Sequence, residues 1–310
     1  MKEKSLILYY NSNSYYFSYV RDEEIDLKCV YRKTNGIFKV LAKLPVISSV
    51  TYGEWKKEIK QYKKVIIFDN AYNENLFRYI KKERSNENVY VYSWNSAINS
   101  KQRTLLEKAN KYFPVYSFDK KDCAKYNFKY APMVYSKDIV KLFRNKNEKP
   151  IYDVLFVGWD KGRTEELYTI YRNIKKMGGK AFFLIKGERR SELETSEFKF
   201  TKTFLSYEEY LRKVCQSKVL INIQQEGQEG LTIRMVEALF FEKKVITNKI
   251  DIDTYDFYDE NNILIMDKNY EEKLQQFIDR PYKPVNKKIL KKYDLEYWAK
   301  NYFKPEDINN

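Results

Sequence analysis

The chain has 310 residues, 43% of them hydrophobic, which is enough to build two domain cores. Its formal net charge of +15 predicts an attraction to polyanions. It contains no histidine, which excludes Ser-His-Asp and Cys-His catalysis and histidine metal ligands, so any proton transfer must use Asp, Glu, Lys, Tyr or the substrate.

The three cysteines lie far apart without a C-x-x-C pair, which argues against a disulfide framework or a zinc site and for a reducing compartment. No stretch approaches the roughly 18–20 apolar residues that span a bilayer, and the run at 6–10 is too short for a signal peptide. We therefore expect a cytoplasmic protein. Three clusters rich in lysine lie at 56–64, 101–111 and 287–292. They are interpreted as solvated helix faces, as contacts to an anionic membrane surface on the inner face of the cell membrane, or as contacts to nucleic acid.

In the first half, short apolar runs alternate with stretches of helical period. The expected strands are 6–10, 27–31, 65–68, 89–93 and 115–118. The expected helices are 54–62, 71–80 and 103–111. This order predicts a mostly parallel sheet with helices on its faces. The polar stretch 136–150 is interpreted as a linker that ends a first domain of residues 1–135.

A second alternating series predicts another domain of the same kind over residues 151–282. Its expected strands are 152–157, 181–185, 219–223, 245–247 and 263–266. Its expected helices are 165–176, 207–215, 231–241 and 270–278, and one further helix at 287–303 belongs to a C-terminal segment, 283–310. The predicted fold class is α/β, with two Rossmann-like doubly wound domains.

Two segments of the second half combine glycine with polar side chains between a strand and a helix. In the first, Gly158 follows a buried strand and Arg163 precedes a helix, so backbone amides and a guanidinium could receive an anion. The alternative is an ordinary tight turn with a surface arginine. In the second, which runs from Gln228 to Glu237, Thr232 and Arg234 lie in the first helical turn, where phosphate is favoured.

A carboxylate at Glu237 suits a ribose or sugar diol, and Glu229, two turns earlier, could face the same crevice. The alternative interpretation of this segment is a capped helix with solvent-exposed Gln and Glu side chains.

The second segment reads Gln228-Glu-Gly-Leu-Thr-Ile-Arg-Met-Val-Glu-Ala238, followed by Lys243-Lys-Val-Ile-Thr-Asn248. It resembles the nucleotide-sugar site of GT-B glycosyltransferases, particularly bacterial enzymes of lipopolysaccharide, capsule and exopolysaccharide assembly. Residues 117–126, 91–95 and 293–298 are similar to other parts of the same group, so the resemblance covers about 85–303. It implies two domains facing across a cleft, with the C-terminal helix crossing back to the first domain.

The resemblance implies a sugar transferase, of the hexosyl or a related type, that moves a sugar from a nucleotide-sugar donor to a glycan or lipid-linked glycan acceptor. The donor site would be lined by Gly158, Arg163, Gln228, Gly230, Leu231, Thr232, Arg234 and Glu237. Arg234 would also stabilise the departing diphosphate. Asp69, directly after the strand at 65–68, is the first candidate for a base if the enzyme inverts, and helix capping is its rival role.

We expect no cofactor and no metal, because the one Asp-x-Asp pair, Asp251 and Asp253, is interpreted as a turn. Two other functions stay open: a non-catalytic transferase-like scaffold of a polysaccharide-synthesis complex, and a basic nucleic-acid-binding protein, although no nucleic-acid motif occurs and none is expected as partner. If Arg234 and Glu237 both face a crevice, alanine at either position should abolish donor binding with little loss of fold.

Overall fold

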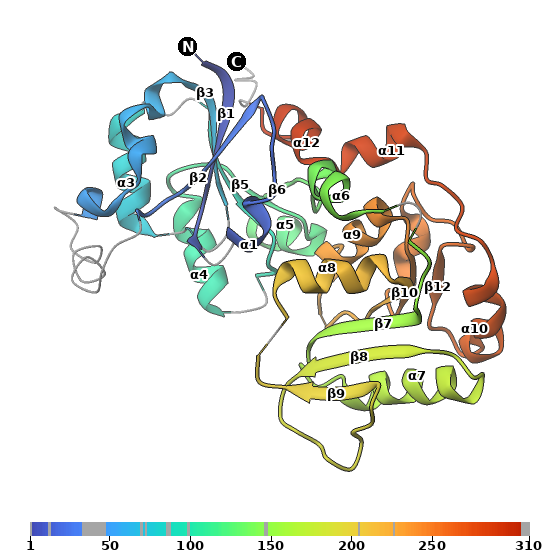
Figure 1. The fold of residues 1–310 in the computed structure, drawn as a ribbon. Helices are drawn as coiled ribbons and strands as arrows, with labels where there is room; N and C mark the ends of the chain where they lie inside the picture. The colour runs from blue at the N-terminus through green and yellow to red at the C-terminus, as the bar shows by residue number, and fades with distance from the viewer. Residues whose placement is uncertain are drawn as a thin grey trace. The chain divides into compact units, whose positions relative to one another are not determined.

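The computed structural model describes residues 2–11, 14–32, 48–68, 71, 73–84, 88–97, 100–145, 148–203, 205–225 and 227–304. These residues form two compact units (Figure 1). Unit 1 comprises residues 1–138, 227–231 and 293–310. Unit 2 comprises residues 139–226 and 232–292. The chain therefore leaves unit 2 for five residues, 227–231, and then returns to it.

Unit 1 contains a six-stranded parallel sheet in the order β2-β1-β3-β4-β5-β6. Its strands are β1 (Lys2–Tyr9), β2 (Ile25–Cys29), β3 (Tyr62–Phe68), β4 (Val89–Ser93), β5 (Val115–Ser117) and β6 (Lys129–Tyr130). The apolar runs of β1, β3 and β4 are buried along most of their length, as expected of parallel strands covered on both faces. The predicted strands of this half are therefore confirmed, and β6 is an addition to them.

One face of this sheet packs on α3 (Glu74–Glu83) and α4 (Ser100–Ala109). Alternate residues of β3, such as Val65 and Ile67, point into this core together with Leu76 and Ile80 of α3. The predicted helix 54–62 is wrong in type, because it consists of two short 3-10 helices, Glu54–Lys57 and Ile59–Gln61. The Glu58 amide bonds three residues back to Trp55, which breaks the α-helical ladder.

The other face of this sheet is aromatic. Phe68 and Tyr92, on neighbouring strands, lie against Trp298 of α12 (Leu295–Asn301), and the Trp298 and Tyr92 ring centroids are 4.6 Å apart. The Trp298 indole N–H and the Tyr92 hydroxyl both donate to the carbonyl oxygen of Pro132, at 3.0 and 2.9 Å. The polar atoms of these buried rings are thereby satisfied, and the C-terminal helix α12 is fixed within unit 1.

Unit 2 contains a second six-stranded parallel sheet, in the order β12-β11-β10-β7-β8-β9. Its strands are β7 (Tyr152–Trp159), β8 (Ala181–Lys186), β9 (Phe198–Thr201), β10 (Ser217–Asn222), β11 (Lys244–Thr247) and β12 (Ile263–Ile265). Five of them match predicted strands, and β9 is an addition. The fold prediction of two α/β domains with parallel sheets is therefore confirmed.

The helices of unit 2 cover both faces of its sheet (Figure 1). The helices α7 (Thr164–Lys176) and α10 (Tyr270–Asp279) share one core with the strands. The helices α8 (Tyr207–Cys215) and α9 (Ile233–Phe241) pack on β10 from the opposite face. This arrangement places the starts of α7 and α9 next to the carboxyl ends of β7 and β10, where parallel α/β sheets bind ligands.

Two predicted segments differ in detail. The expected linker 136–150 contains a helix, α6 (Lys137–Phe143), and the expected helix 287–303 is two helices, α11 (Lys287–Lys292) and α12. The break falls at Asp294, whose carboxylate accepts from the Lys137 amide at 3.1 Å and lies 3.1 Å from the Lys137 ammonium. Across the described part of the chain, every helix is too short or too polar to cross a bilayer.

Candidate anion-binding site

Three cationic side chains gather at the carboxyl ends of β7 and β10 in unit 2: Lys161, Arg163 and Arg234. Arg163 stands at the start of α7 and donates to three backbone carbonyls. Its Nε reaches Asp160 at 3.1 Å, its Nη2 reaches Trp159 at 2.5 Å, and its Nη1 reaches Ile223. The guanidinium thus joins the ends of two strands, which predefines its position.

Arg234, in the first turn of α9, is held in the same way. Its Nη1 donates to the Ile221 carbonyl at 3.0 Å and its Nη2 to the Val157 carbonyl. Both guanidinium groups also lie near the ring of Phe156, with centroid distances of 5.0 Å for Arg234 and 5.5 Å for Arg163. The shared ring and the carbonyls keep two like charges side by side with few rotamers left to them.

The charges in this cationic cluster are not neutralised by these contacts, because carbonyl oxygens carry only partial charge. Burial, with the nearby Arg234, lowers the pKa of Arg163 to about 10. Burial also lowers the pKa of Lys161, and both arginines add to the effect. Desolvation is the larger cause in both cases, mutual repulsion of the cations adds to it, and Asp160 and Glu166 oppose it at Arg163. An anion with two or more charges would relieve this repulsion, so the arrangement is suited to a diphosphate.

Gly158 is adjacent to this cluster and lies within β7, paired with Ile185 of β8. A Cβ atom at this position would stand 3.2 Å from Nη2 of Arg234 and 3.1 Å from the Phe156 ring. The glycine therefore leaves the space that the Arg234 guanidinium occupies, which is a packing reason for it that the sequence alone did not supply.

The starts of α7 and α9 differ in what they offer an anion. At α7 the Asp160 carboxylate accepts from the amides of Arg163 and Thr164, at 3.1 and 3.0 Å, so the sequence-based expectation of free amides at this helix start is wrong. At α9 the cap is the neutral Thr232 hydroxyl, which accepts from the Met235 amide. The first amides of a helix have no partner within it, and beside a neutral cap they suit a phosphate.

Glu237 lies one turn after Arg234 in α9 and is 3% exposed. Its Oε1 accepts from the Tyr210 hydroxyl and its Oε2 from the Tyr207 hydroxyl at 3.4 Å, both on α8. Burial and the nearby Glu237 carboxylate raise the pKa of Tyr210 well above its usual range, so the phenol stays protonated. This burial and these two hydrogen bonds indicate that replacing Glu237 would cost stability, contrary to the expectation from the sequence.

Gln228, Gly230 and Leu231 belong to unit 1, whereas Thr232, Arg234 and Glu237 belong to unit 2. Leu231 is buried and Gln228 is half-buried. Glu229 precedes the helix, which begins only at Ile233, and its carboxylate pairs with Lys121 at 3.0 Å. The expectation that places Glu229 two helical turns before Glu237 is therefore wrong, because Glu229 lies outside the helix.

The remaining predicted residues add no second site. Asp69 lies outside the described residues. Asp251 and Asp253 fall in a 3-10 helix, Ile250–Thr254, and Asp251 pairs with Lys249 at 2.8 Å. Within the described ranges, no three Cys, Asp or Glu side chains gather as metal ligands would.

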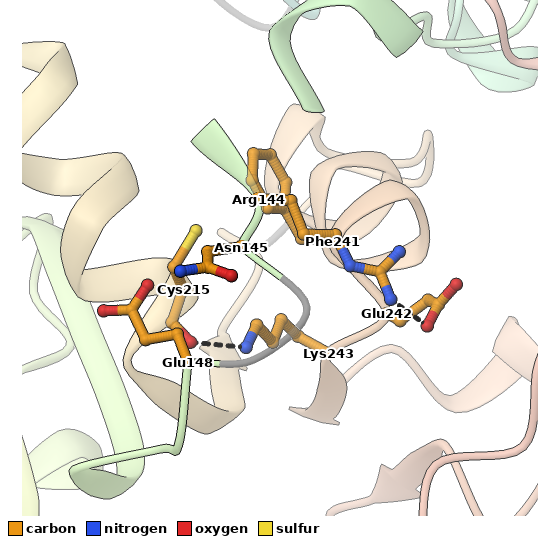
Figure 2. Close-up of a pocket in the computed structure, with 7 residues that line it drawn as sticks. All are labelled: Arg144, Asn145, Glu148, Cys215, Phe241, Glu242 and Lys243. Atoms are coloured by element: carbon orange, nitrogen blue, oxygen red, sulfur yellow. Dashed lines mark hydrogen bonds and ion pairs between the residues drawn. The ribbon is translucent and has the colours of Figure 1, made fainter. Parts of the chain in front are cut away.

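A pocket of about 320 Å³ lies elsewhere in unit 2, at the carboxyl ends of α8 and α9 (Figure 2). Three of its charged side chains have partners: Arg144 pairs with Glu242, and Lys243 donates to the Cys215 carbonyl at 2.7 Å. It contains none of the predicted site residues, which are Gly158, Arg163, Gln228, Gly230, Leu231, Thr232, Arg234 and Glu237.

Sequence reasoning missed the supporting residues of the site. Lys161 lies between Gly158 and Arg163, and Phe156 lies two residues before Gly158, but the sequence assigns neither of them a role. Tyr207 and Tyr210 follow the i, i+3 spacing of one helix face, which could have indicated a joint partner. That this partner is Glu237 depends on α8 and α9 being neighbours, which only the three-dimensional fold provides.

Comparison with known proteins defines the class of fold. No family model and no curated protein sequence matches the chain. Among the solved structures that match nearly its whole length are the following three. HepE of Anabaena, solved with UDP and glucose, has a TM-score of 0.56 at 9% identity and covers 96% of this chain and 97% of its own.

A glycosyltransferase from Rickettsia africae has a TM-score of 0.54 at 11% identity, with 96% of each chain covered. An alpha-glucosyltransferase, solved with UDP and a 13-mer DNA, has a TM-score of 0.53 at 14% identity, covering 96% of this chain and 94% of its own. The chain therefore has the two-domain α/β fold of GT-B glycosyltransferases.

Proposed function

We propose that this protein is a glycosyltransferase that uses a nucleotide-sugar donor. The observation that carries the proposal is the cationic cluster of Lys161, Arg163 and Arg234 at the carboxyl ends of β7 and β10. In a doubly wound sheet this edge is where ligands bind. A diphosphate carries several negative charges, which complement the three positive charges of the cluster. The fold is also similar to that of HepE, which was solved with UDP.

In the proposed reaction the bond between the sugar and the diphosphate breaks while the acceptor hydroxyl oxygen forms a new bond to the same sugar carbon. The hydroxyl proton passes to a carboxylate base, for which Asp69 is the candidate, or to the departing diphosphate. Negative charge grows on the leaving diphosphate, and Arg163, Arg234 and the first amides of α9 stabilise it. Because carbonyls already hold the guanidinium groups, little reorganisation is needed at that moment. Gly158 keeps the space for Arg234, and Gln228, Gly230, Leu231 and Thr232 stay candidate donor-binding residues. Glu237 supports the site indirectly, because its hydrogen bonds to Tyr207 and Tyr210 hold α9 against α8.

The finer proposal is that the nucleotide is UDP, that the cationic cluster makes the reaction independent of metal, and that the acceptor is a growing surface glycan. UDP is supported by the structures of similar fold that were solved with it. The glycan of lipopolysaccharide, capsule or exopolysaccharide is supported by the motif from Gln228 to Ala238. A net charge of +15 is compatible with work on lipid-linked acceptors at an anionic membrane surface.

A nucleic-acid acceptor is the second candidate. The observations that favour it are the same net charge and the fold shared with an alpha-glucosyltransferase solved with DNA. Binding of a DNA duplex that weakens steeply between 50 and 200 mM salt, as expected from roughly six or more phosphate contacts, would support this acceptor. A non-catalytic scaffold would bind no donor at all.

The proposed function is tested by a thermal-shift panel with UDP, GDP, CMP, ADP and TDP and their sugar conjugates, with EDTA and with divalent cations. A ligand at about 100 times its Kd stabilises a fold by about 2.7 kcal/mol, which is measurable. We expect a shift with UDP and its conjugates that is the same in EDTA. Absence of any shift would favour the scaffold instead.

A substitution at Gly158 gives an internal test. The added methyl of Gly158→Ala would stand 3.2 Å from Nη2 of Arg234 and 3.1 Å from the Phe156 ring, so the guanidinium and the ring must shift by a few tenths of an ångström. We expect UDP affinity to fall about tenfold, about 1.4 kcal/mol, as measured by titration calorimetry. Unchanged affinity would mean that the position of Arg234 does not matter for the ligand.

A further inference from the structure

The loop of residues 227–231 is the one excursion of the chain into unit 1 between β10 and α9, both of which belong to unit 2. It begins at Gly227, whose φ of +82° is in the left-handed region that favours glycine. It ends one residue before Thr232, the cap of α9. The loop is therefore continuous in the chain with the arginine-bearing helix α9.

Asp119 of unit 1 holds this loop through hydrogen bonds. Its side chain is buried, and its two oxygens serve different segments. Oδ1 accepts from the amides of Lys121 and Asp122, at 3.0 and 3.5 Å, and so caps α5 (Lys120–Tyr126). Oδ2 accepts from the amides of Glu229 and Gly230, both at 3.1 Å. Capping α5 requires only the first oxygen, so the second is available for the loop.

A second contact fixes the same loop independently. Gly230 packs closely against Phe118, the residue before Asp119. A Cβ atom at Gly230 would stand 2.5 Å from the Phe118 ring and 2.9 Å from the Phe118 carbonyl oxygen. Only glycine permits this approach. The Lys121–Glu229 ion pair at 3.0 Å is solvent-exposed and adds little. Packing and two charge-assisted hydrogen bonds therefore hold the loop to residues 118 and 119.

We propose that Asp119 is a positioning residue for donor binding, which it supports without touching the donor. The proposal rests on the proposed function, in which Gln228, Gly230 and Leu231 line the donor site. A carboxylate acceptor for two consecutive amides holds the loop in one conformation before the ligand arrives. Binding of the donor then loses less conformational entropy, because the loop is already ordered in the free protein.

The test replaces Asp119 by residues that still cap a helix. Asp119→Asn offers a single acceptor oxygen, so it can serve α5 or the loop but not both. Asp119→Ser also caps but has no second oxygen to offer the loop. The matched control is Asp122→Asn, which removes the same charge from the same helix, where the Asp122 carboxylate accepts from Ala97 at 2.6 Å and not from the loop.

Two readouts are taken on the full chain: amide hydrogen exchange over 227–231, and UDP affinity by calorimetry. With either Asp119 variant we expect loop exchange to rise about tenfold and affinity to fall about tenfold, with both unchanged in Asp122→Asn. The proposal is overturned if Asp119→Ser exchanges like the wild type, if its affinity is unchanged, or if the control is equally impaired. A wild-type protein that binds no nucleotide overturns the proposed function instead, and the positioning role with it.

Discussion

Arg234→Ala should reduce UDP affinity by roughly a hundredfold or more, corresponding to about 2.7 kcal/mol. The substitution removes one of two guanidinium groups that the carbonyls of β7 and β10 hold at the proposed diphosphate site. Removing one partner of a largely desolvated charge pair costs about 2–5 kcal/mol. The UDP affinity of Arg234→Lys should lie between those of the wild type and Arg234→Ala, because lysine keeps the charge but lacks the planar guanidinium. Calorimetric titration of the three proteins measures this order.

The matched control is Arg172→Ala, which removes the same charge from an exposed position of α7. It should bind UDP within about twofold of the wild type, since exposed charges are screened at physiological salt. Equal losses in both variants would mean that overall charge, and not the cationic cluster, attracts the nucleotide. Wild-type affinity of Arg234→Ala for UDP would mean that the cationic cluster does not bind the nucleotide.

Glu237→Ala should lower the free energy of unfolding by about 2–4 kcal/mol, measured by urea denaturation. The carboxylate is 3% exposed and accepts hydrogen bonds from Tyr210 and Tyr207, so its loss leaves a buried phenol without its acceptor and a void between α8 and α9. The physical reason is the same one that makes any unpaired buried polar group expensive.

Glu272→Ala, on the exposed first turn of α10, is the control and should change stability by no more than about 0.5 kcal/mol. The double substitution Glu237→Gln with Tyr210→Phe should recover part of the lost stability, because it removes the phenol that would lose its charged acceptor. A fully stable Glu237→Ala protein that no longer binds UDP would instead support direct contact between Glu237 and the donor, as first expected from the sequence.

The strand pattern was predictable because parallel strands buried on both faces read as unbroken apolar runs. The runs at 65–68, 89–93 and 152–157 were found in this way, and the alternation of runs with helical stripes was enough to predict two α/β domains. The elements that were missed are short or polar. The strand β6 has two residues, and α5 carries charges along most of its length, so neither shows a period.

The candidate site was predictable only in part. Polar residues beside glycine after a strand pointed to Gly158 and Arg163, and the motif pointed to Arg234. What each side chain bonds to could not be predicted, because it depends on strand ends that are distant in sequence, such as Trp159 and Ile223 around Arg163. The burial of Glu237 and the docking of the Gly230 loop on Asp119 are tertiary contacts of the same kind.

Transfer of sugar from a nucleotide donor is tested most directly by measuring the UDP that is released from UDP-glucose and UDP-N-acetylglucosamine in EDTA. The assay compares the wild type with Arg234→Ala and Arg172→Ala, with and without glycan acceptors. We expect UDP release that an acceptor accelerates. Arg172→Ala should retain the wild-type rate of release, and Arg234→Ala should lower that rate by at least about a hundredfold. UDP release equal in the wild type and Arg234→Ala, or none from any donor that the wild type binds, would contradict it.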